Sequence, residues 1–137
     1  MRVILLIMIG LSVLNAEISR DSNGIVTDTN TNLQWQDDAV GSMMSWEAAI
    51  AQCEGLELDG TGWRLPNINE LKSIVDKSKV NPAIVDGFVK TSSNRYWSST
   101  TYELFKNHAW YVTFYSGYSD FYYKGYKYYV RCVRDGQ

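Results

Sequence analysis

The centre of the chain reads Trp63-Arg64-Leu65-Pro66-Asn67-Ile68-Asn69-Glu70-Leu71, and this stretch decides the fold. Pro66 pushes the residue before it into an extended conformation, so a helix can begin only after the proline. Asn67 is well suited to cap that helix, because Glu70 stands three positions later as the acidic partner of a capping box. The segment therefore predicts an extended chain that turns sharply into a helix.

The helix is expected to bury one apolar stripe and to end soon afterwards. Leu71, Ile74 and Val75 form the stripe at helical spacing, which predicts a helix to about Lys77. Asn81-Pro82 follows as a break. Three lysines should face solvent near the negative end of the helix dipole: Lys72, Lys77 and Lys79.

Upstream, the sequence predicts a hairpin and then a first helix. Residues 24–27 and 33–36 are short β-prone runs, and the residues between them favour a turn. Ser45 can cap a helix over residues 46–54, in which Trp46, Ala49, Ile50 and Cys53 share one face. We therefore expect Cys53 to point into the core.

Downstream, aromatic and β-branched residues predict strands over 96–100, 109–115, 119–123 and 127–133. Turns are expected at Ser116-Gly117 and Lys124-Gly125. Alternation places Trp110, Val112 and Phe114 on one face, with Tyr111, Thr113 and Tyr115 on the other. The predicted fold class is α+β, with two helices packed on a twisted antiparallel sheet that runs as a meander.

The first sixteen residues have the order of a secretory signal. Arg2 precedes an apolar run over residues 3–14, and the small residue Ala16 marks the expected cleavage point. The apolar run is shorter than the roughly 20 residues that a permanent membrane helix needs. We expect a signal peptide at 1–16 and one domain at 17–137, in a secreted, periplasmic or cell-surface protein, with an uncleaved tether as the alternative.

The two cysteines, Cys53 and Cys132, bear on compartment and stability. An exported protein meets an oxidising environment, and these residues can form a single intramolecular bond. It would close a loop of about 80 residues and contribute roughly 4.5 kcal/mol in the chain-entropy treatment. Two unpaired buried thiols are the alternative.

Charge and aromatic residues divide the chain into unlike halves. Residues 17–86 contain 5 Lys or Arg against 12 Asp or Glu, whereas residues 87–137 contain 7 against 3. All ten tyrosines also lie in the second half. The net charge of −2 indicates no nucleic-acid partner, but the second half is locally basic and aromatic.

Several segments, taken in order, resemble the Lcl C-terminal domain family over roughly residues 24–134. They are Val26-Thr27-Asp28, Leu33-Gln34-Trp35-Gln36, Trp46 to Cys53, Trp63-Arg64-Leu65-Pro66-Asn67 with Glu70-Leu71, Tyr96-Trp97-Ser98-Ser99-Thr100, Ala109-Trp110-Tyr111-Val112 and Val130-Arg131-Cys132-Val133-Arg134. The resemblance implies a C-type-lectin-like fold with a disulfide from the first helix to the last strand. It also implies a bacterial envelope or secreted domain, in a family mostly of unknown function whose namesake is a collagen-like adhesin that binds sulfated polysaccharides. This sequence has no collagen-like stalk, so trimerisation and multivalent adhesion are not implied.

Lysine and arginine donors with aromatic faces could bind an anionic or sulfated glycan. The candidate ligand-binding residues are Lys106, Tyr111, Tyr115, Tyr122, Tyr123, Lys124, Tyr126, Lys127 and Arg131. An ordinary tyrosine-rich core is the competing interpretation, and Arg64 and Arg131 are also expected to tie loops to the sheet. The partner is then an extracellular polysaccharide, or alternatively an envelope protein that uses the fold without sugar recognition.

Other chemistries find little support. His108 is the sole histidine, and no catalytic motif surrounds it, so we expect no enzyme. The spacing of the cysteines and the histidine does not match a zinc site, and the proline loops of calcium-dependent lectins are absent. Four loop carboxylates could offer oxygen ligands for a structural calcium, namely Asp28, Asp37, Asp38 and Asp59, although an acidic loop is more often simply solvated. No cofactor is predicted.

Overall fold

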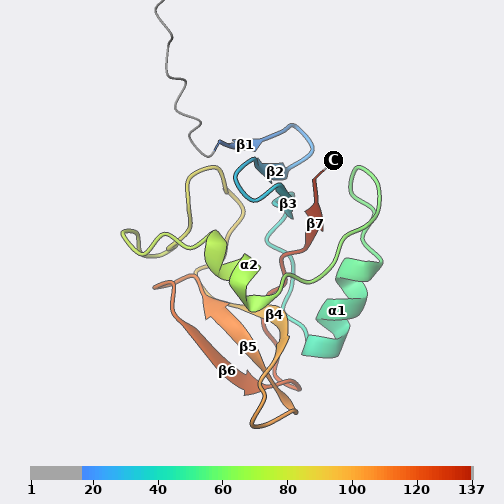
Figure 1. Ribbon diagram of the computed structural model, residues 1–137, viewed down its shortest axis with the longest axis vertical. Helices are drawn as coiled ribbons and strands as arrows, with labels where there is room; N and C mark the ends of the chain where they lie inside the picture. The colour runs from blue at the N-terminus through green and yellow to red at the C-terminus, as the bar shows by residue number, and fades with distance from the viewer. Residues whose placement is uncertain (1–16, 137) are drawn as a thin grey trace, which may run out of the picture.

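The computed structural model describes residues 17–136 and consists of two antiparallel sheets with two short helices. Figure 1 shows one sheet above the other, with α1 beside them and α2 over the junction. The predicted signal peptide lies outside the described residues. Among the residues described, no helix is long and apolar enough to cross a membrane.

The upper sheet joins the two ends of the described chain. Its strands, in spatial order, are β1 (Ile18–Arg20), β2 (Ile25–Asp28), β3 (Leu33–Gln36) and β7 (Val133–Asp135). The predicted hairpin is therefore confirmed as β2 and β3, with Val26 opposite Trp35. Trp35 also lies opposite Val133 of β7, so the last strand of the chain forms one edge of this sheet.

The lower sheet is a three-stranded meander of β4 (Arg95–Thr101), β5 (His108–Thr113) and β6 (Ser119–Tyr123). Pairing runs regularly from His108 opposite Tyr123 to Val112 opposite Ser119. Between β4 and β5 the register shifts after Trp97. A register shift of this kind locally bends and twists a strand pair.

The prediction of one continuous sheet is wrong at its last strand. Residues 127–133 do not form a fourth strand of the meander; Tyr128 bridges to Met44 and Tyr129 bridges to Tyr96 as isolated pairs. Only from Val133 does the chain become a regular strand, and there it pairs with β3. The segment therefore passes between two sheets and satisfies its backbone groups with several different partners.

Both helices begin where the sequence places them. α1 covers Trp46–Glu54, with Ser45 at the N-cap, although the Ser45 side chain makes no capping hydrogen bond. α2 covers Ile68–Ser73, and the capping box of Asn67 and Glu70 is complete. It ends four residues before the predicted Lys77, because Val75 leaves the helix to bridge Ile84.

The predicted disulfide is present between Cys53 and Cys132, whose Cα atoms lie 5.4 Å apart. Cys53 lies in α1 and is fully buried, as expected. Cys132 comes directly before β7 rather than within it. The bond therefore fastens α1 to the segment that enters the upper sheet, within one of two hydrophobic clusters that fill the interior.

Candidate functional site

Six of the nine candidate ligand-binding residues lie at one end of the lower sheet. The register that puts His108 opposite Tyr123 brings the start of β5 beside the end of β6. Residues 106–107 and 122–127 therefore meet at the same edge. We call this the turn surface, and its candidate residues are Lys106, Tyr122, Tyr123, Lys124, Tyr126 and Lys127.

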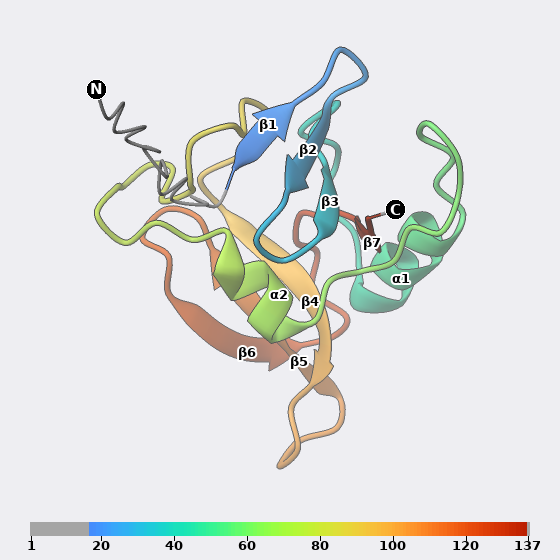
Figure 2. The same ribbon diagram turned by 45° about the horizontal axis from the view of Figure 1, so that its top comes forward.

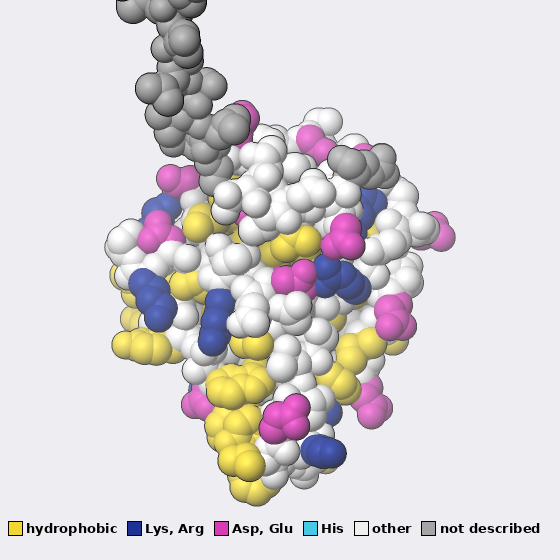
Figure 3. Space-filling view, in the orientation of Figure 1, with side chains coloured by type: hydrophobic (Ala, Val, Ile, Leu, Met, Phe, Trp, Pro, Cys, Tyr) yellow, Lys and Arg dark blue, Asp and Glu magenta, His cyan; other side chains and the backbone are white. Residues whose placement is uncertain are grey.

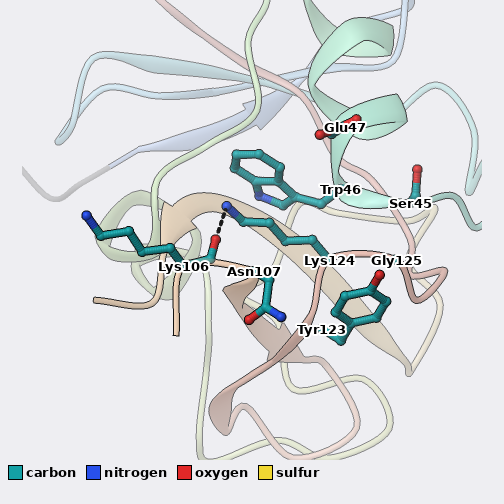
Figure 4. Close-up of a pocket in the computed structure, with 8 residues that line it drawn as sticks. All are labelled: Ser45, Trp46, Glu47, Lys106, Asn107, Tyr123, Lys124 and Gly125. Atoms are coloured by element: carbon teal, nitrogen blue, oxygen red, sulfur yellow. Dashed lines mark hydrogen bonds between the residues drawn. The ribbon is translucent and has the colours of Figure 1, made fainter. Parts of the chain in front are cut away.

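A pocket of about 410 Å³ opens at the turn surface (Figure 4). It lies between the start of α1, the loop before β5 and the turn after β6. Its lining is Ser45, Trp46, Glu47, Lys106, Asn107, Tyr123, Lys124 and Gly125. The acidic half of the sequence contributes only Ser45, Trp46 and Glu47 to this lining, and the basic half contributes the other residues. The fold therefore places the start of α1 against the basic half of the chain.

Lys124 links the three segments that line the pocket. Its ammonium donates hydrogen bonds to the Thr101 hydroxyl at 2.9 Å and to the Lys106 carbonyl at 2.8 Å. It also lies 3.9 Å from the centroid of the Trp46 indole, within range of a cation–π interaction. With its donors largely engaged, Lys124 anchors the turn to α1, and the turn surface needs other cations to bind an anion.

Those cations are Lys106 and Lys127, which are both exposed. Within residues 17–136 neither of them forms an ion pair. Figure 4 shows the Lys106 side chain directed away from the pocket while its carbonyl faces Lys124. The exposed carboxylate of Glu47 lines the pocket itself, so an anion is better received on the outer side of the turn.

Exposed tyrosines form that outer side. Tyr122 and Tyr126 meet edge to face, with ring centroids 4.6 Å apart, and Tyr123 lies 6.5 Å from Tyr126. A shallow hollow of about 420 Å³ is lined by Tyr123, Gly125, Tyr126 and Lys127. The hydrogen bond with Tyr126 raises the pKa of the Tyr122 phenol, so the Tyr122 hydroxyl stays a neutral donor at physiological pH.

Three candidate residues lie elsewhere. Tyr115 is exposed, but it follows β5 at the far end of the hairpin, roughly 20 Å along the strand from the turn surface. Tyr111 is only 6% exposed, beneath the exposed guanidinium of Arg95. Arg131 is 3% exposed. The structure therefore does not bring these three residues to the turn surface.

Arg131 and Arg64 have the structural role that the sequence suggested. Arg131 donates to Asp37 Oδ1 at 2.9 Å, and its other bonds reach the Gln36 and Lys90 carbonyls and the Thr91 hydroxyl. Arg64 forms a bidentate pair with Glu70 and a second ion pair with Asp135. Both arginines tie loops to the upper sheet.

Two residues that contact candidate residues were not singled out from the sequence. Trp46 was assigned only to the core, yet it is half-buried and its ring receives Lys124. Arg95 stacks on Tyr111 and Tyr128, with its guanidinium carbon 5.0 and 5.6 Å from the two ring centroids. Its position directly before the strand predicted over 96–100 gave no signal, because the contact depends on residues far along the chain.

The potential ligands for a metal are dispersed or engaged. Asp37 is fully buried and bonded to two arginines, and the Asp28 carboxylate accepts a hydrogen bond from the Asn30 backbone. The His108 ring contacts the Asn107 amide oxygen at 2.7 Å. Across residues 17–136, no group of three acidic, histidine or cysteine side chains is placed to hold a metal ion.

Comparison with known proteins gives one informative result. The profile of the Lcl C-terminal domain matches residues 24–134, which covers most of the chain and nearly all of the described structure. Among curated proteins, no sequence matches. The matched range includes α1, α2, both cysteines and the whole turn surface. The chain belongs to the Lcl C-terminal domain family.

Proposed function

We propose that this protein is a non-catalytic binding module, secreted or held in the bacterial envelope, that binds an anionic or sulfated polysaccharide. The ligand lies along the turn surface. In this proposal the architecture is a variant of the C-type-lectin-like fold that the family resemblance implies, although neither calcium nor a cofactor takes part.

The observation that carries the proposal is the combination of exposed rings and unpaired lysines at the turn surface. Tyr122, Tyr123 and Tyr126 are 40%, 48% and 52% exposed, although each carries a large apolar ring. Pyranose rings present apolar C–H faces that pack on such rings, while phenol hydroxyls bond the sugar hydroxyls. Lys127 lines the hollow with Tyr123 and Tyr126, and Lys106 lies at the rim of the neighbouring pocket. These two lysines supply the charge that a sulfate or carboxylate requires.

The turn and the ring of Tyr123 are also held in place before any ligand arrives. A side chain on Gly125 would collide with the ring of Tyr123, so the turn packs closely on that ring. Lys124 fixes the same turn to Thr101 and Trp46. A preformed surface loses less conformational entropy on binding, which favours a weak ligand such as a polysaccharide.

Binding of a sulfated polysaccharide such as heparin to the purified chain, measured over a series of salt concentrations, tests this proposal. The double variant Lys106→Ala/Lys127→Ala should weaken binding roughly tenfold at low salt, since each exposed ion pair is worth up to about 1 kcal/mol. It should also flatten the salt dependence.

The matched control is Lys72→Ala/Lys77→Ala, which removes two other lysines that form no ion pair within residues 17–136. That variant changes net charge equally and should keep most of the affinity. Equal losses in both variants would mean that only net charge matters. Absence of binding to any polyanion, together with capture of a specific envelope protein, would instead favour a protein-interaction domain.

A further inference from the structure

A second exposed feature of the molecule lies outside the turn surface. The connection between β4 and β5, residues 102–107, projects from the lower end of the molecule (Figures 1 and 2). Leu104 is 76% exposed and Phe105 is 57% exposed. Neither belongs to the two core clusters. We call residues 103–105, at the apex of this connection, the hairpin tip.

Hydrogen bonds at its base hold the hairpin tip in this shape. The Tyr102 amide donates to the His108 carbonyl, and the His108 amide donates to the Phe105 carbonyl, both at 2.9 Å. The Lys106 carbonyl accepts the bond from Lys124 at 2.8 Å. These bonds fix both ends of the tip, so its apolar side chains stay in solvent although water contact is unfavourable for them.

A cluster of half-buried aromatic rings stands directly behind the tip. Tyr102 stacks on Phe121 with centroids 3.7 Å apart and ring planes 4° from parallel. Trp110 meets both rings at 5.6 Å, edge to face. Figure 3 shows hydrophobic side chains running as a ridge to the lower end of the molecule. The tip and these rings form one convex apolar surface.

Charged groups begin where the ridge meets the body of the protein. Lys72 lies 6.0 Å from the centroid of the Trp110 ring, and Lys106 directly follows the tip. One carboxylate, that of the exposed Glu103 in the tip, partly balances these lysines. The local charge is close to neutral, so electrostatic attraction alone would not bring this surface to a partner.

The outermost part of this surface consists of the aliphatic and phenyl groups of the tip. Tyrosine and tryptophan rings lie nearer to the body of the protein, and lysines lie beyond them. This order matches the layers of a lipid leaflet: hydrocarbon, the interfacial zone that tyrosine and tryptophan prefer, and headgroups that lysine reaches. The surface is convex, which suits insertion into a fluid phase and offers no groove to a small ligand or helix.

We propose that the hairpin tip inserts Leu104 and Phe105 into the outer layer of a lipid bilayer, with Tyr102, Trp110 and Phe121 at the headgroup level. This contact is peripheral and reversible, because two side chains bury too little apolar surface for permanent anchoring. It is also independent of polysaccharide binding, which uses the turn surface.

Co-sedimentation with vesicles tests the proposal, using phosphatidylcholine alone and an equal mixture of phosphatidylcholine and phosphatidylglycerol. Burying one large apolar side chain changes a partition coefficient by roughly tenfold to a hundredfold. Leu104→Ser/Phe105→Ser should therefore lower the bound fraction at least tenfold on both kinds of vesicle. Val80→Ser is the control, since Val80 is 63% exposed and outside the tip.

Bromine-labelled acyl chains provide an independent readout. They should quench the tryptophan fluorescence of the bound protein, and Trp110→Phe should remove most of that quenching. Pelleting that is unchanged in the tip variant, or quenching that survives in Trp110→Phe, would overturn the proposal. So would a lipid-free dimer, seen in sedimentation velocity, that the tip variant abolishes.

The tip variant also separates the two proposals. It should keep the heparin affinity of the parent protein, while Lys106→Ala/Lys127→Ala should still bind phosphatidylcholine vesicles. A single variant that lost both activities would show that the two surfaces act as one site and would contradict this assignment.

Discussion

Replacing Asp37 with asparagine should destabilise the protein more than any other isosteric change of one carboxylate. Asp37 follows β3 and is fully buried. Its carboxylate accepts bonds from Arg20 Nε at 2.7 Å and Arg131 Nη1 at 2.9 Å. It also accepts the backbone amides of Val89 and Lys90 at 2.9 and 3.1 Å. Four segments distant in sequence thus meet at one side chain.

The magnitude follows from what asparagine cannot do. Its amide nitrogen cannot accept these bonds, and its neutral charge leaves the guanidinium of Arg131, 3% exposed, without a counter-ion. Breaking one half of a buried ion pair costs about 3–5 kcal/mol. For a domain of this size, that loss lowers the melting temperature by roughly 10–20 °C.

Urea and thermal unfolding followed by circular dichroism measure the loss directly. Asp38→Asn is the matched control, because Asp38 is the exposed neighbour and should change stability by less than about 0.5 kcal/mol. In a double-mutant cycle, Arg131→Met should recover part of the Asp37→Asn loss, since the uncompensated charge is gone. A loss below about 1 kcal/mol for Asp37→Asn would refute this account of the cluster.

The same cluster makes the stability of the folded protein depend on pH. Burial alone would raise the pKa of Asp37, but hydrogen bonds from Arg131 and the Val89 amide and the arginine charge hold it below its ordinary value. The stabilisation is therefore complete above the unfolded-state value of about 3.9 and is lost as pH falls through the lower folded-state value. Asp37→Asn should lack this part of the acid-induced loss.

Three further predictions concern the framework. Reduction of the Cys53–Cys132 bond, whose residues are 79 positions apart, should cost about 2–5 kcal/mol in urea unfolding under matched oxidised and reduced conditions. Gly117→Ala should lower the melting temperature more than Gly62→Ala does. Both glycines have a positive φ, but only at Gly117 would an added Cβ meet Val75, at 2.6 Å. Equal melting temperatures of the two variants would contradict this. Glu70→Gln should lower the free energy of unfolding by about 1–3 kcal/mol at neutral pH, because it weakens the capping box and the bidentate arginine pair. Burial raises the pKa of Glu70, but the Arg64 hydrogen bonds lower it overall, so parent and variant should converge in stability only as pH falls through this lowered pKa.

Elements specified by local signals could be predicted from the sequence. The capping box at Asn67 fixed the start of α2, and periodicity gave the bounds of α1. The hairpin of β2 and β3 followed from two β-prone runs around a turn. In each case the residues that decide the structure lie within about ten positions of one another, so propensity and capping are sufficient.

Pairings between distant segments could not be predicted in the same way. Residues 127–133 have the composition of a strand, but Tyr128 and Val133 find partners at Met44 and Arg64. Nothing in the local pattern distinguishes these partners from a neighbouring strand of the meander. The early end of α2 has the same origin, since the bridge from Val75 to Ile84 replaces a last helical turn.

The candidate site illustrates a related limit. Alternation assigned Tyr111 and Val112 to opposite faces of β5, but both faces of that strand are covered, so both residues are buried. The cluster at residues 122–127 was visible because its tyrosines and lysines are adjacent in sequence. Leu104 and Phe105 were overlooked, because two apolar residues in a loop resemble a core segment until the fold shows them exposed.

A titration of the isotope-labelled protein with a sulfated oligosaccharide, followed by amide chemical shifts, tests the proposed function most directly. We expect the largest shifts at residues 106–107 and 122–127, and we expect them to diminish as salt is added. Shifts centred on Tyr115 and Asn81 at the opposite end of the sheet, or none at low salt, would contradict the assignment of the turn surface.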